Sequence, residues 1–302
     1  MRRESTMPET PRPGGTYPLA GRDTPRIGYG AMQLAESRVR EPLAVDASTR
    51  LLRRALELGV THFDTAEFYG GGEANRRLRA AFAPYSDDVV LVSKVGAVHV
   101  EGANPPLVPA QKPAELRAQV EQNLRTLGAE RLAVVNLRRV DGPPGIVAEG
   151  DQIVPLDDQL AEMIALRDEG KIDGIGLSSV SAEQIEQALP AGIACVQNLF
   201  NLVTRDDDAL AVCRDNGVAW VPFFPLGSGF PGAAKVTDQP AVQEQAARLG
   251  ATPAQVGLAW LLAHSPNVML IPGTTSIEHL EENVAAGGVT LDEEAMRALD
   301  AV

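Results

Sequence analysis

Cysteine and aromatic residues are scarce in this sequence. Only two cysteines, Cys195 and Cys213, occur in 302 residues, and aromatic residues account for 4% of the composition. The spacing of the cysteines matches no zinc or redox motif, and each lies in an apolar or helical context. We therefore expect two small, reduced core cysteines and no metal site.

Positive charge and long apolar runs are also in short supply. Asp and Glu total 40 against 27 Lys and Arg, which leaves a formal net charge of -13. This acidity opposes binding to nucleic acid, because phosphate contacts need a basic face. No apolar run is long enough to cross a membrane, and the start of the chain lacks the apolar stretch of a secretory signal. We expect a cytosolic protein with neither nucleic acid nor membrane as a partner.

A glycine-rich dinucleotide motif is missing as well. No G-x-G-x-x-G follows the first expected strand, although open dinucleotide-binding sheets carry one at that turn. Instead, short apolar runs alternate with helical patterns from Arg26 onward, as in successive βα units. Eight such units favour the α/β class and a closed (β/α)8 TIM barrel. The expected strands lie at 27–31, 62–65, 89–94, 132–138, 172–178, 194–197, 219–224 and 268–271.

The composition changes near the N-terminus. Residues 1–16 are rich in proline, glycine and charge, and such a segment cannot bury enough apolar area to offset the entropy lost on ordering. We expect a flexible tail over 1–16, followed by a single barrel domain over 17–302.

Helix boundaries are predicted by spacing. Apolar residues recur at helical intervals from Leu116 to Leu127 and stop at Gly128. Pro253 occupies the first position that a helix favours for proline. Capping-box spacing predicts helix starts at Ser181 with Gln184, Thr252 with Gln255, and Thr290 with Glu293.

Polar residues stand at the ends of several expected strands. In a barrel the carboxyl ends of the strands form one mouth, where chemistry gathers. The residues expected to converge there are Asp64, Lys94, Arg138, Ser178 and Gln197. The loops expected to close over a substrate, at 98–109, 142–154 and 226–240, carry no readable specificity code.

Tyr69, Lys94 and Asp64 are suited to carbonyl reduction. Hydride transfer to a carbonyl needs a proton donor at the developing alkoxide, and tyrosine can serve if a nearby cation eases its ionisation. Asp64 would hold Lys94 in place and keep it charged. The competing interpretation is a loop tyrosine beside a structural ion pair.

Several ordered segments resemble the aldo-keto reductases. The first is FDTAEFYGGGE at 63–73, followed by Ser93 and Lys94. The segment GKIDGIGLSSV at 170–180 resembles the fifth strand and nicotinamide loop of that family. The similarity continues at 196–198, 223–229 and 271–283, and it spans nearly all of 17–302. It implies the barrel fold, an NADP(H) cofactor and catalysis by Tyr69, Lys94 and Asp64.

The resemblance also assigns residues to the nicotinamide end of the cofactor. Ser178, Ser179 and Gln197 would hydrogen-bond its carboxamide, and Phe223 would stack on its ring, since an aromatic face needs no hydroxyl. Ser179 stands where asparagine is commoner, and its alternative role is capping of the strand end. Further cofactor contacts are implied for Gly30, Ala31, Met32, Pro225, Leu226 and Gly227.

The segment IPGTTSIEHLEEN at 271–283 opens a helix whose first turn offers N–H groups to an anion. Relatives that prefer NADPH often carry lysine at the Gly273 position and arginine at the His279 position. Thr274, Ser276 and His279 can still donate hydrogen bonds, so the resemblance implies NADPH. Glu282 and Asn283 would face the adenine. The alternative for His279 is an ordinary exposed histidine.

Arg138 is the largest departure from the family pattern, because most relatives have histidine there. Arginine is permanently charged and acts only as a donor. It can polarise a carbonyl or bind an anionic or phenolate oxygen, but it cannot relay a proton. Proximity to Lys94 would disfavour protonation of the lysine. Alternatively, Arg138 pairs with Asp64 or Glu67 and catalysis is weakened.

The segment NLR at 136–138, together with IPGTTS at 271–276, is similar to a subgroup that includes bacterial pyridoxal reductases. Pyridoxal carries an aldehyde beside a phenolic oxygen, which Arg138 would bind by a charge-assisted hydrogen bond. We expect an NADPH-dependent oxidoreductase that reduces an aldehyde, with pyridoxal as the candidate substrate. A broad aldehyde and ketone reductase and a weakly catalytic NADPH-binding redox sensor are the alternatives.

Overall fold

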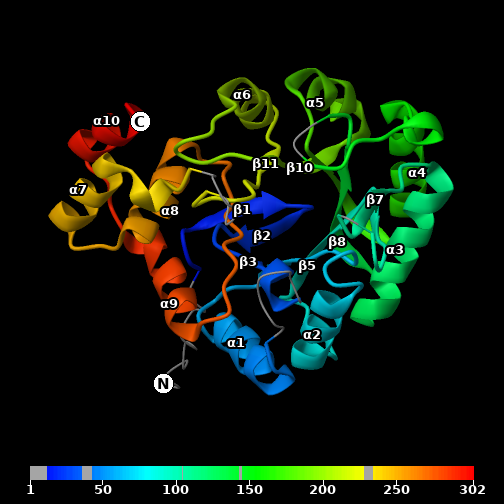
Figure 1. Cartoon of the computed structure of the whole chain (residues 1–302), viewed down its shortest axis with the longest axis horizontal. Helices are drawn as coiled ribbons and strands as arrows, with labels where there is room; N and C mark the ends of the chain where they lie inside the picture. Colours follow the sequence, from blue (N-terminus) through cyan, green and yellow to red (C-terminus); the bar gives the residue numbers. More distant parts are fainter. Residues whose placement is uncertain (1–11, 36–42, 104, 143–144, 228–233) are drawn as a thin grey trace, which may run out of the picture.

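A parallel sheet of seven strands curls around the centre of the molecule (Figure 1). The computed structural model describes residues 12–35, 43–103, 105–142, 145–227 and 234–302. The strand order is β11-β10-β9-β8-β5-β4-β3, so neighbours in the sheet follow one another along the chain. The strands are β3 (Tyr29–Gly30), β4 (His62–Asp64), β5 (Val90–Val95), β8 (Leu132–Arg138), β9 (Ile172–Ser178), β10 (Ile193–Gln197) and β11 (Ala219–Trp220).

Residues 268–270 close the ring between its first and last strands. Val268 forms a parallel bridge with Trp220, and Leu270 forms one with Ile27. The Met269 N–H donates to the Trp220 carbonyl at 2.8 Å, and the Leu270 N–H donates to the Arg26 carbonyl at 2.7 Å. The expected eighth strand is therefore present as isolated bridges, and the predicted barrel fold is confirmed.

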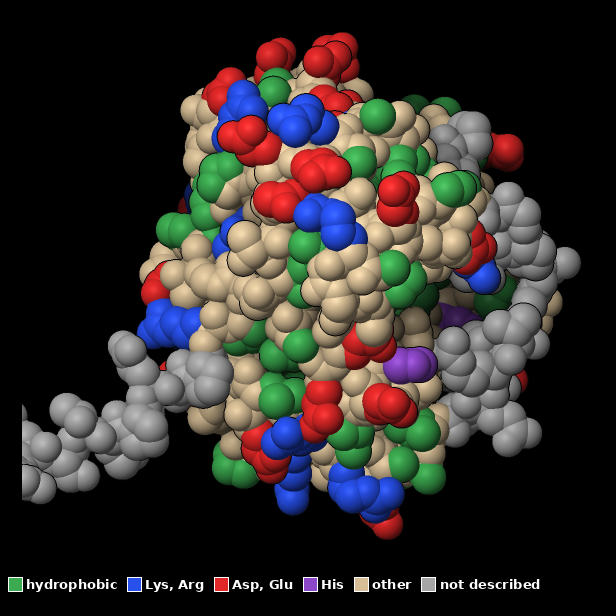
Figure 2. All heavy atoms as spheres, turned by 90° about the vertical axis from the view of Figure 1, so that its left-hand side faces the viewer, with side chains coloured by type: hydrophobic (Ala, Val, Ile, Leu, Met, Phe, Trp, Pro, Cys, Tyr) green, Lys and Arg blue, Asp and Glu red, His purple; other side chains and the backbone are tan. Residues whose placement is uncertain are grey.

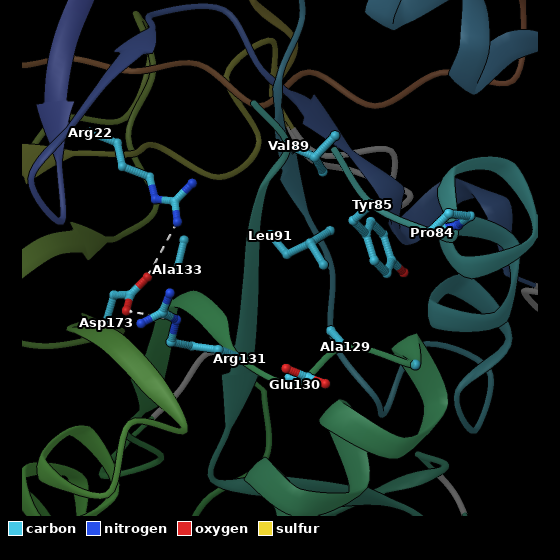
Figure 3. A pocket seen from close by; sticks show the side chains of 11 residues that line it. Arg22, Pro84, Tyr85, Val89, Leu91, Ala129, Glu130, Arg131, Ala133 and Asp173 are labelled. Atoms are coloured by element: carbon cyan, nitrogen blue, oxygen red, sulfur yellow. Dashed lines mark ion pairs between the residues drawn. The ribbon is translucent and has the colours of Figure 1, made fainter. Parts of the chain in front are cut away.

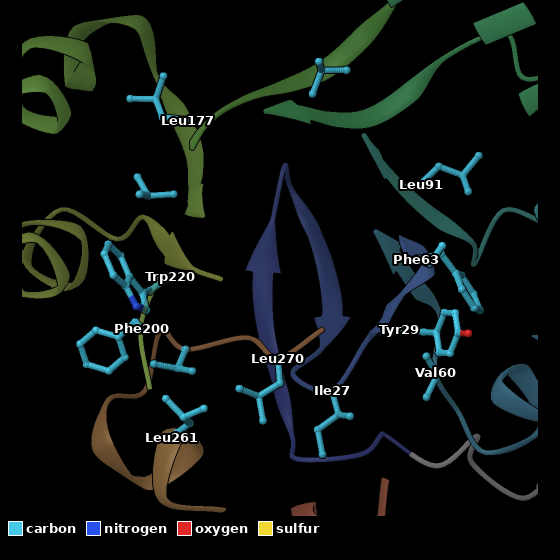
Figure 4. Packing of buried hydrophobic residues seen from close by; sticks show 14 of the residues in the cluster. Ile27, Tyr29, Val60, Phe63, Leu91, Leu177, Phe200, Trp220, Leu261 and Leu270 are labelled. Atoms are coloured by element: carbon cyan, nitrogen blue, oxygen red, sulfur yellow. The ribbon is translucent and has the colours of Figure 1, made fainter. Parts of the chain in front are cut away.

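Helices surround the sheet (Figure 1). Side chains on the outer face of the strands are covered by these helices, and Figure 4 shows Phe63, Leu177 and Trp220 pointing away from the centre of the ring. Full burial of each such side chain is worth roughly 1.5–3 kcal/mol. The helices are α1 (Val45–Glu57), α2 (Glu73–Phe82), α3 (Pro113–Leu127), α4 (Leu156–Asp168), α5 (Ala182–Ala188), α6 (Asp207–Asp215), α7 (Pro240–Leu249), α8 (Pro253–His264), α9 (Ile277–Ala285) and α10 (Glu293–Asp300).

Most of the predicted helix boundaries agree with the structure. Helix α3 ends where Gly128 adopts a left-handed φ of 65°, and capping boxes start α5 at Ser181 and α8 at Thr252. The predicted start at Thr290 is wrong. Asp292 caps α10 by accepting a hydrogen bond from the Ala295 N–H at 2.8 Å, because a carboxylate directly before the helix reaches that donor.

A hairpin that the sequence did not predict fills the end of the barrel formed by the amino-terminal ends of the strands, which we call the lower end. It consists of β1 (Thr16–Leu19) and β2 (Arg22–Pro25), which pair in antiparallel orientation. Leu19 is fully buried and packs among inward-facing residues such as Val90 and Met269. Residues 1–11 of the expected tail lie outside the described residues. Within 12–16, Gly15 accepts a backbone hydrogen bond from Arg26 at 2.9 Å, and the flexibility of the tail stays a prediction.

A cavity of about 360 Å³ opens beside this hairpin, near the amino-terminal ends of β5, β8 and β9 (Figure 3). Its charged groups neutralise one another, because Asp173 pairs with Arg131 at 3.1 Å and with Arg22 at 3.6 Å. These lining residues place the cavity at the end of the barrel opposite the carboxyl ends of the strands, where side chains usually serve stability.

The two cysteines are buried free thiols, as expected. None of the helices in the described part of the chain is long and apolar enough to span a membrane. On the face that carries α7, α9 and α10, basic side chains are interspersed with acidic ones (Figure 2).

Candidate active site

Asp64 and Lys94 form a buried ion pair at the carboxyl ends of β4 and β5. The Lys94 ammonium donates to Asp64 Oδ1 at 2.5 Å and to the Thr65 carbonyl at 3.0 Å. The two side chains are only 4% and 7% exposed. Removal of either partner from such a pair would leave an uncompensated charge in a dry site.

The charge of Lys94 is set by opposing effects. Burial lowers its pKa, but the charges of Asp64 and Tyr69 and their hydrogen bonds outweigh burial, so the pKa is raised. Arg138 is not among the groups that set this pKa, so its expected effect on Lys94 stays a prediction. Asp64 lies in direct contact with the ammonium, and an opposite charge at this distance favours the protonated lysine.

Tyr69 is placed over Lys94 by a tight loop between β4 and α2. The Tyr69 N–H donates to the Ala66 carbonyl at 3.1 Å, and the Lys94 ammonium lies 5.1 Å from the centre of the tyrosine ring. The next three residues, Gly70, Gly71 and Gly72, have positive φ angles of 60°, 56° and 83°. Such a run needs residues without a Cβ, and it turns the chain directly into α2.

Gln197 supports the ion pair, a role that sequence reasoning missed. Its Nε2 donates to Asp64 Oδ2 at 2.7 Å, so both carboxylate oxygens are bonded. Its Oε1 is buried and has no hydrogen-bond partner among the described residues. An unpaired buried acceptor at the end of β10 suits the N–H of a carboxamide, the cofactor contact predicted for Gln197.

Asn198 holds the loop after β9, a role that the sequence analysis did not predict for it. Asn198 Oδ1 accepts from the Val180 N–H at 3.1 Å, and its Nδ2 donates to the Val180 carbonyl at 2.7 Å. The residue before Val180, Ser179, is exposed and has a φ of 60°. Asparagine tolerates this left-handed conformation better than serine, so an asparagine would be less strained at this position. Ser178 is buried beside it.

Two close backbone approaches shape the opposite side of the mouth. A Cβ on Gly30 would lie 2.5 Å from the Ile271 carbonyl oxygen, and a Cβ on Gly273 would lie 2.7 Å from the Gly30 oxygen. Both positions therefore need glycine. After Gly30, Ala31 is buried and Met32 is 46% exposed at the start of a short 3-10 helix, η1 (Ala31–Leu34).

The segment after β11 carries the predicted aromatic contact. Phe223 is half-buried, and its ring packs edge-to-face on Phe224 at 5.4 Å. Pro225 and Leu226 are also half-buried. Gly227 has a φ of 89°, and it bridges to Lys235.

The entrance of α9 fits an anion. Ser276 caps the helix by accepting from the His279 N–H at 3.3 Å, and Thr274 Oγ1 accepts from the Ser276 N–H at 3.0 Å. The N–H groups of Ile277 and Glu278 have no acceptor among the described residues, so they are available to a phosphate. His279 is exposed and Asn283 is buried. Glu282 accepts a hydrogen bond from the Thr252 hydroxyl.

Arg138 is a cation without a carboxylate partner. Its side chain makes no ion pair or hydrogen bond within the described residues, so the alternative pairing with Asp64 or Glu67 is not found there. Burial lowers its pKa, and the neighbouring Tyr69 opposes that change. Arg139 differs, because it pairs with Asp141 at 2.7 Å and bonds Gln159. Of the two neighbouring arginines, Arg139 is therefore the one that is bonded to other parts of the scaffold.

No three His, Cys, Asp or Glu side chains in the described ranges gather closely enough to hold a metal ion. The groups at the mouth are instead a lysine, a tyrosine, a free guanidinium, and donors and acceptors suited to a dinucleotide.

Comparison with known proteins agrees with this arrangement. Residues 26–302 match the model of the aldo/keto reductase family. The chain is 44% identical to pyridoxine 4-dehydrogenase of Escherichia coli (strain K12) over 291 residues, which cover 95% of this chain and 98% of the relative. It is 35% identical to an uncharacterised oxidoreductase of Schizosaccharomyces pombe, over 95% of this chain and 89% of the relative.

Among solved structures, an aldo-keto reductase of Klebsiella pneumoniae in complex with NADPH superposes with a TM-score of 0.78 at 27% identity. That match covers 95% of this chain and 94% of the other. A family match over residues 26–302, a relative at 44% identity and a shared barrel fold lead to one conclusion. The chain belongs to the aldo/keto reductase family.

Proposed function

We propose that this protein is an NADPH-dependent reductase that converts an aldehyde to an alcohol, with pyridoxal as the substrate. The observation that carries the proposal is the buried Asp64–Lys94 pair with Tyr69 above it and the unpaired Arg138 beside it. Pyridoxine 4-dehydrogenase, the relative at 44% identity, is named for the reverse direction of such a reaction. A location in the cytosol stays part of the proposal.

The nicotinamide supplies the hydride when it is bound. The Tyr69 hydroxyl then donates a proton to the developing alkoxide, which is general acid catalysis. Lys94 stays protonated because Asp64 raises its pKa against the effect of burial, and its charge stabilises the tyrosine oxygen as the proton leaves. Gln197 keeps Asp64 in place through its Oδ2 atom.

Several groups are suited to hold the cofactor. Gln197 Oε1 and the Ser178–Ser179 turn would receive the carboxamide, and Phe223 offers a half-buried aromatic face for the ring. The free N–H groups at the start of α9 would receive the 2′-phosphate, with Thr274, Ser276 and His279 around them. These assignments support NADPH and rest on unpaired donors and acceptors.

Arg138 supports the choice of substrate. A guanidinium without a carboxylate partner is available to bind the phenolic oxygen beside the aldehyde of pyridoxal. The sensor alternative followed from pairing of Arg138 with a carboxylate. No such ion pair joins Arg138 to the described residues. We therefore favour catalysis.

The test follows NADPH oxidation by absorbance with pyridoxal and a panel of simple aldehydes. The Tyr69→Phe variant should lose about 10²–10⁴-fold in kcat, the usual contribution of a positioned acid, while NADPH binding measured by fluorescence is retained. Tyr85→Phe is the matched control, because the Tyr85 hydroxyl donates to the Leu127 carbonyl at the other end of the barrel.

Preference for pyridoxal that collapses only in Tyr69→Phe would support the proposal in full. Turnover of other aldehydes alone would leave a broad-specificity reductase. NADPH binding with no turnover of any carbonyl would overturn the proposal and restore the sensor.

A further inference from the structure

Arg138 presents a physical problem, since its side chain is half-buried and a guanidinium withdrawn from water is usually held by a carboxylate. The described residues offer no such partner to its side chain. The group that lies against it is the face of Phe68, with the guanidinium carbon 5.9 Å from the ring centre. A cation over an aromatic face is attracted by the ring quadrupole, and the attraction is strongest where water is excluded.

Phe68 is itself firmly placed. It is only 7% exposed and packs with Ala66 and Ala97, with Leu107 and Ile146 against the same cluster. These contacts join the β4–α2 loop to the strands β6 (Ala97–His99) and β7 (Leu107–Pro109) and to the loop after β8. The ring therefore cannot move without disturbing three segments of the mouth.

Phe68 also contacts the proposed acid. Its ring meets that of Tyr69 edge-to-face, with centres 5.2 Å apart and planes at 86°. One phenylalanine thus touches both the tyrosine and the arginine, and it sets the position of one relative to the other. An aromatic ring can do this without occupying the N–H donors of the guanidinium, whereas a carboxylate would consume them.

We infer that Phe68 is a positioning residue, which holds the Arg138 guanidinium beside the Tyr69 hydroxyl so that its N–H groups bind an oxygen adjacent to the reacting aldehyde. The inference rests on the proposed reductase function and deepens it. It assigns specificity for aromatic aldehydes with an ortho oxygen to the Phe68–Arg138 contact.

The test compares salicylaldehyde, which has a phenolic oxygen beside its aldehyde, with benzaldehyde, which lacks one. The readout is the ratio of the two kcat/KM values. Phe68→Leu removes the aromatic face but keeps an apolar side chain. It should lower the ratio about tenfold, which lies between the values for an exposed and a fully desolvated cation–π contact. Phe68→Tyr keeps the face and should retain the parent ratio.

Arg138→Met provides the second arm. It should lower the ratio at least as far as Phe68→Leu does. The double variant should have the same ratio as Arg138→Met alone, because Phe68 acts on the ratio only through Arg138. Phe68→Met replaces Phe68→Leu if the leucine variant melts early, since methionine fills irregular space.

Equal losses with both aldehydes in the Phe68 variants would overturn the inference and leave Phe68 as packing. So would an additional loss of the ratio in the double variant. The proposed function fails differently, since the parent protein would then reduce neither aldehyde, or Tyr69→Phe would keep its activity.

Discussion

His62 is buried inside the barrel with neither ring nitrogen hydrogen-bonded to a described residue. It lies on the same face of β4 as Asp64, two residues away. A Cβ on Gly28 would lie 2.9 Å from the imidazole, so the ring fits only because a glycine faces it. Burial lowers the pKa of His62 to about 4, although Asp64 raises it and Lys94 lowers it further. The side chain is therefore neutral at pH 7.

This histidine should make the protein less stable in acid. Its pKa is about 4 in the folded state against 6.5 for the free side chain, so between these values the unfolded chain binds a proton that the folded chain does not. Stability should therefore fall as the pH drops through this window, by about 3 kcal/mol from this group.

Denaturant unfolding at pH 7 and at pH 4.5 measures the loss. His62→Leu should reduce the difference between the two pH values, whereas His279→Gln removes an exposed histidine and serves as the control. An unchanged difference in His62→Leu would contradict the assignment.

At the scale of single elements, two candidate helix caps show that the correct spacing in the sequence is not sufficient for capping. Thr252 and Thr290 both precede a glutamine or glutamate by three residues. Only Thr252 acts as a cap, accepting from the Gln255 N–H at 3.2 Å, while Asp292 performs that role for α10. A local motif permits a cap, but the path of the chain decides which candidate reaches the free N–H groups.

The two threonines therefore make a matched pair for measurement. Thr252→Ala should lower the free energy of unfolding by about 1 kcal/mol, the usual cost of a lost cap. Thr290→Ala should change it by less than about 0.5 kcal/mol, as for most exposed positions. Equal effects of the two substitutions in denaturant unfolding would show that capping geometry is not what separates them.

At the scale of the whole molecule, stability and chemistry lie at opposite ends of the barrel. The β1–β2 hairpin fills the lower end through Leu19, whereas Asp64, Tyr69, Lys94 and Arg138 belong to the carboxyl ends of the strands and the loops that follow. A closed barrel leaves no sheet edge, so its lower end can be filled without reshaping the mouth.

Leu19→Ala should consequently lower stability by about 3 kcal/mol, within the range for a large-to-small core substitution. The kcat/KM for pyridoxal should change less than about twofold at a temperature where the variant is folded, because the barrel separates its lower end from its mouth. Unfolding curves and steady-state kinetics on the same preparation check both. A large kinetic loss without a loss of stability would contradict this separation.

The strands of the barrel, the helices that alternate with them and the family resemblance were all readable in the sequence. Those features depend on periodicity and on residues close together in the chain, such as Asp64 and Tyr69. The hairpin escaped prediction because its four-residue strands carry proline and charge and are stabilised by burial against distant residues. The bond from Gln197 to Asp64 spans 133 residues, and no local pattern reports such a contact.

Arg138 shows the same division. Its identity and its position at the end of a strand were readable in the sequence, but Phe68 was not among the partners that the sequence suggested. Whether it pairs with a carboxylate or rests on Phe68 depends on side chains from different loops meeting at the mouth. Local periodicity reports which residues share an element, whereas the field and packing around a charge arise only when the ring of strands closes.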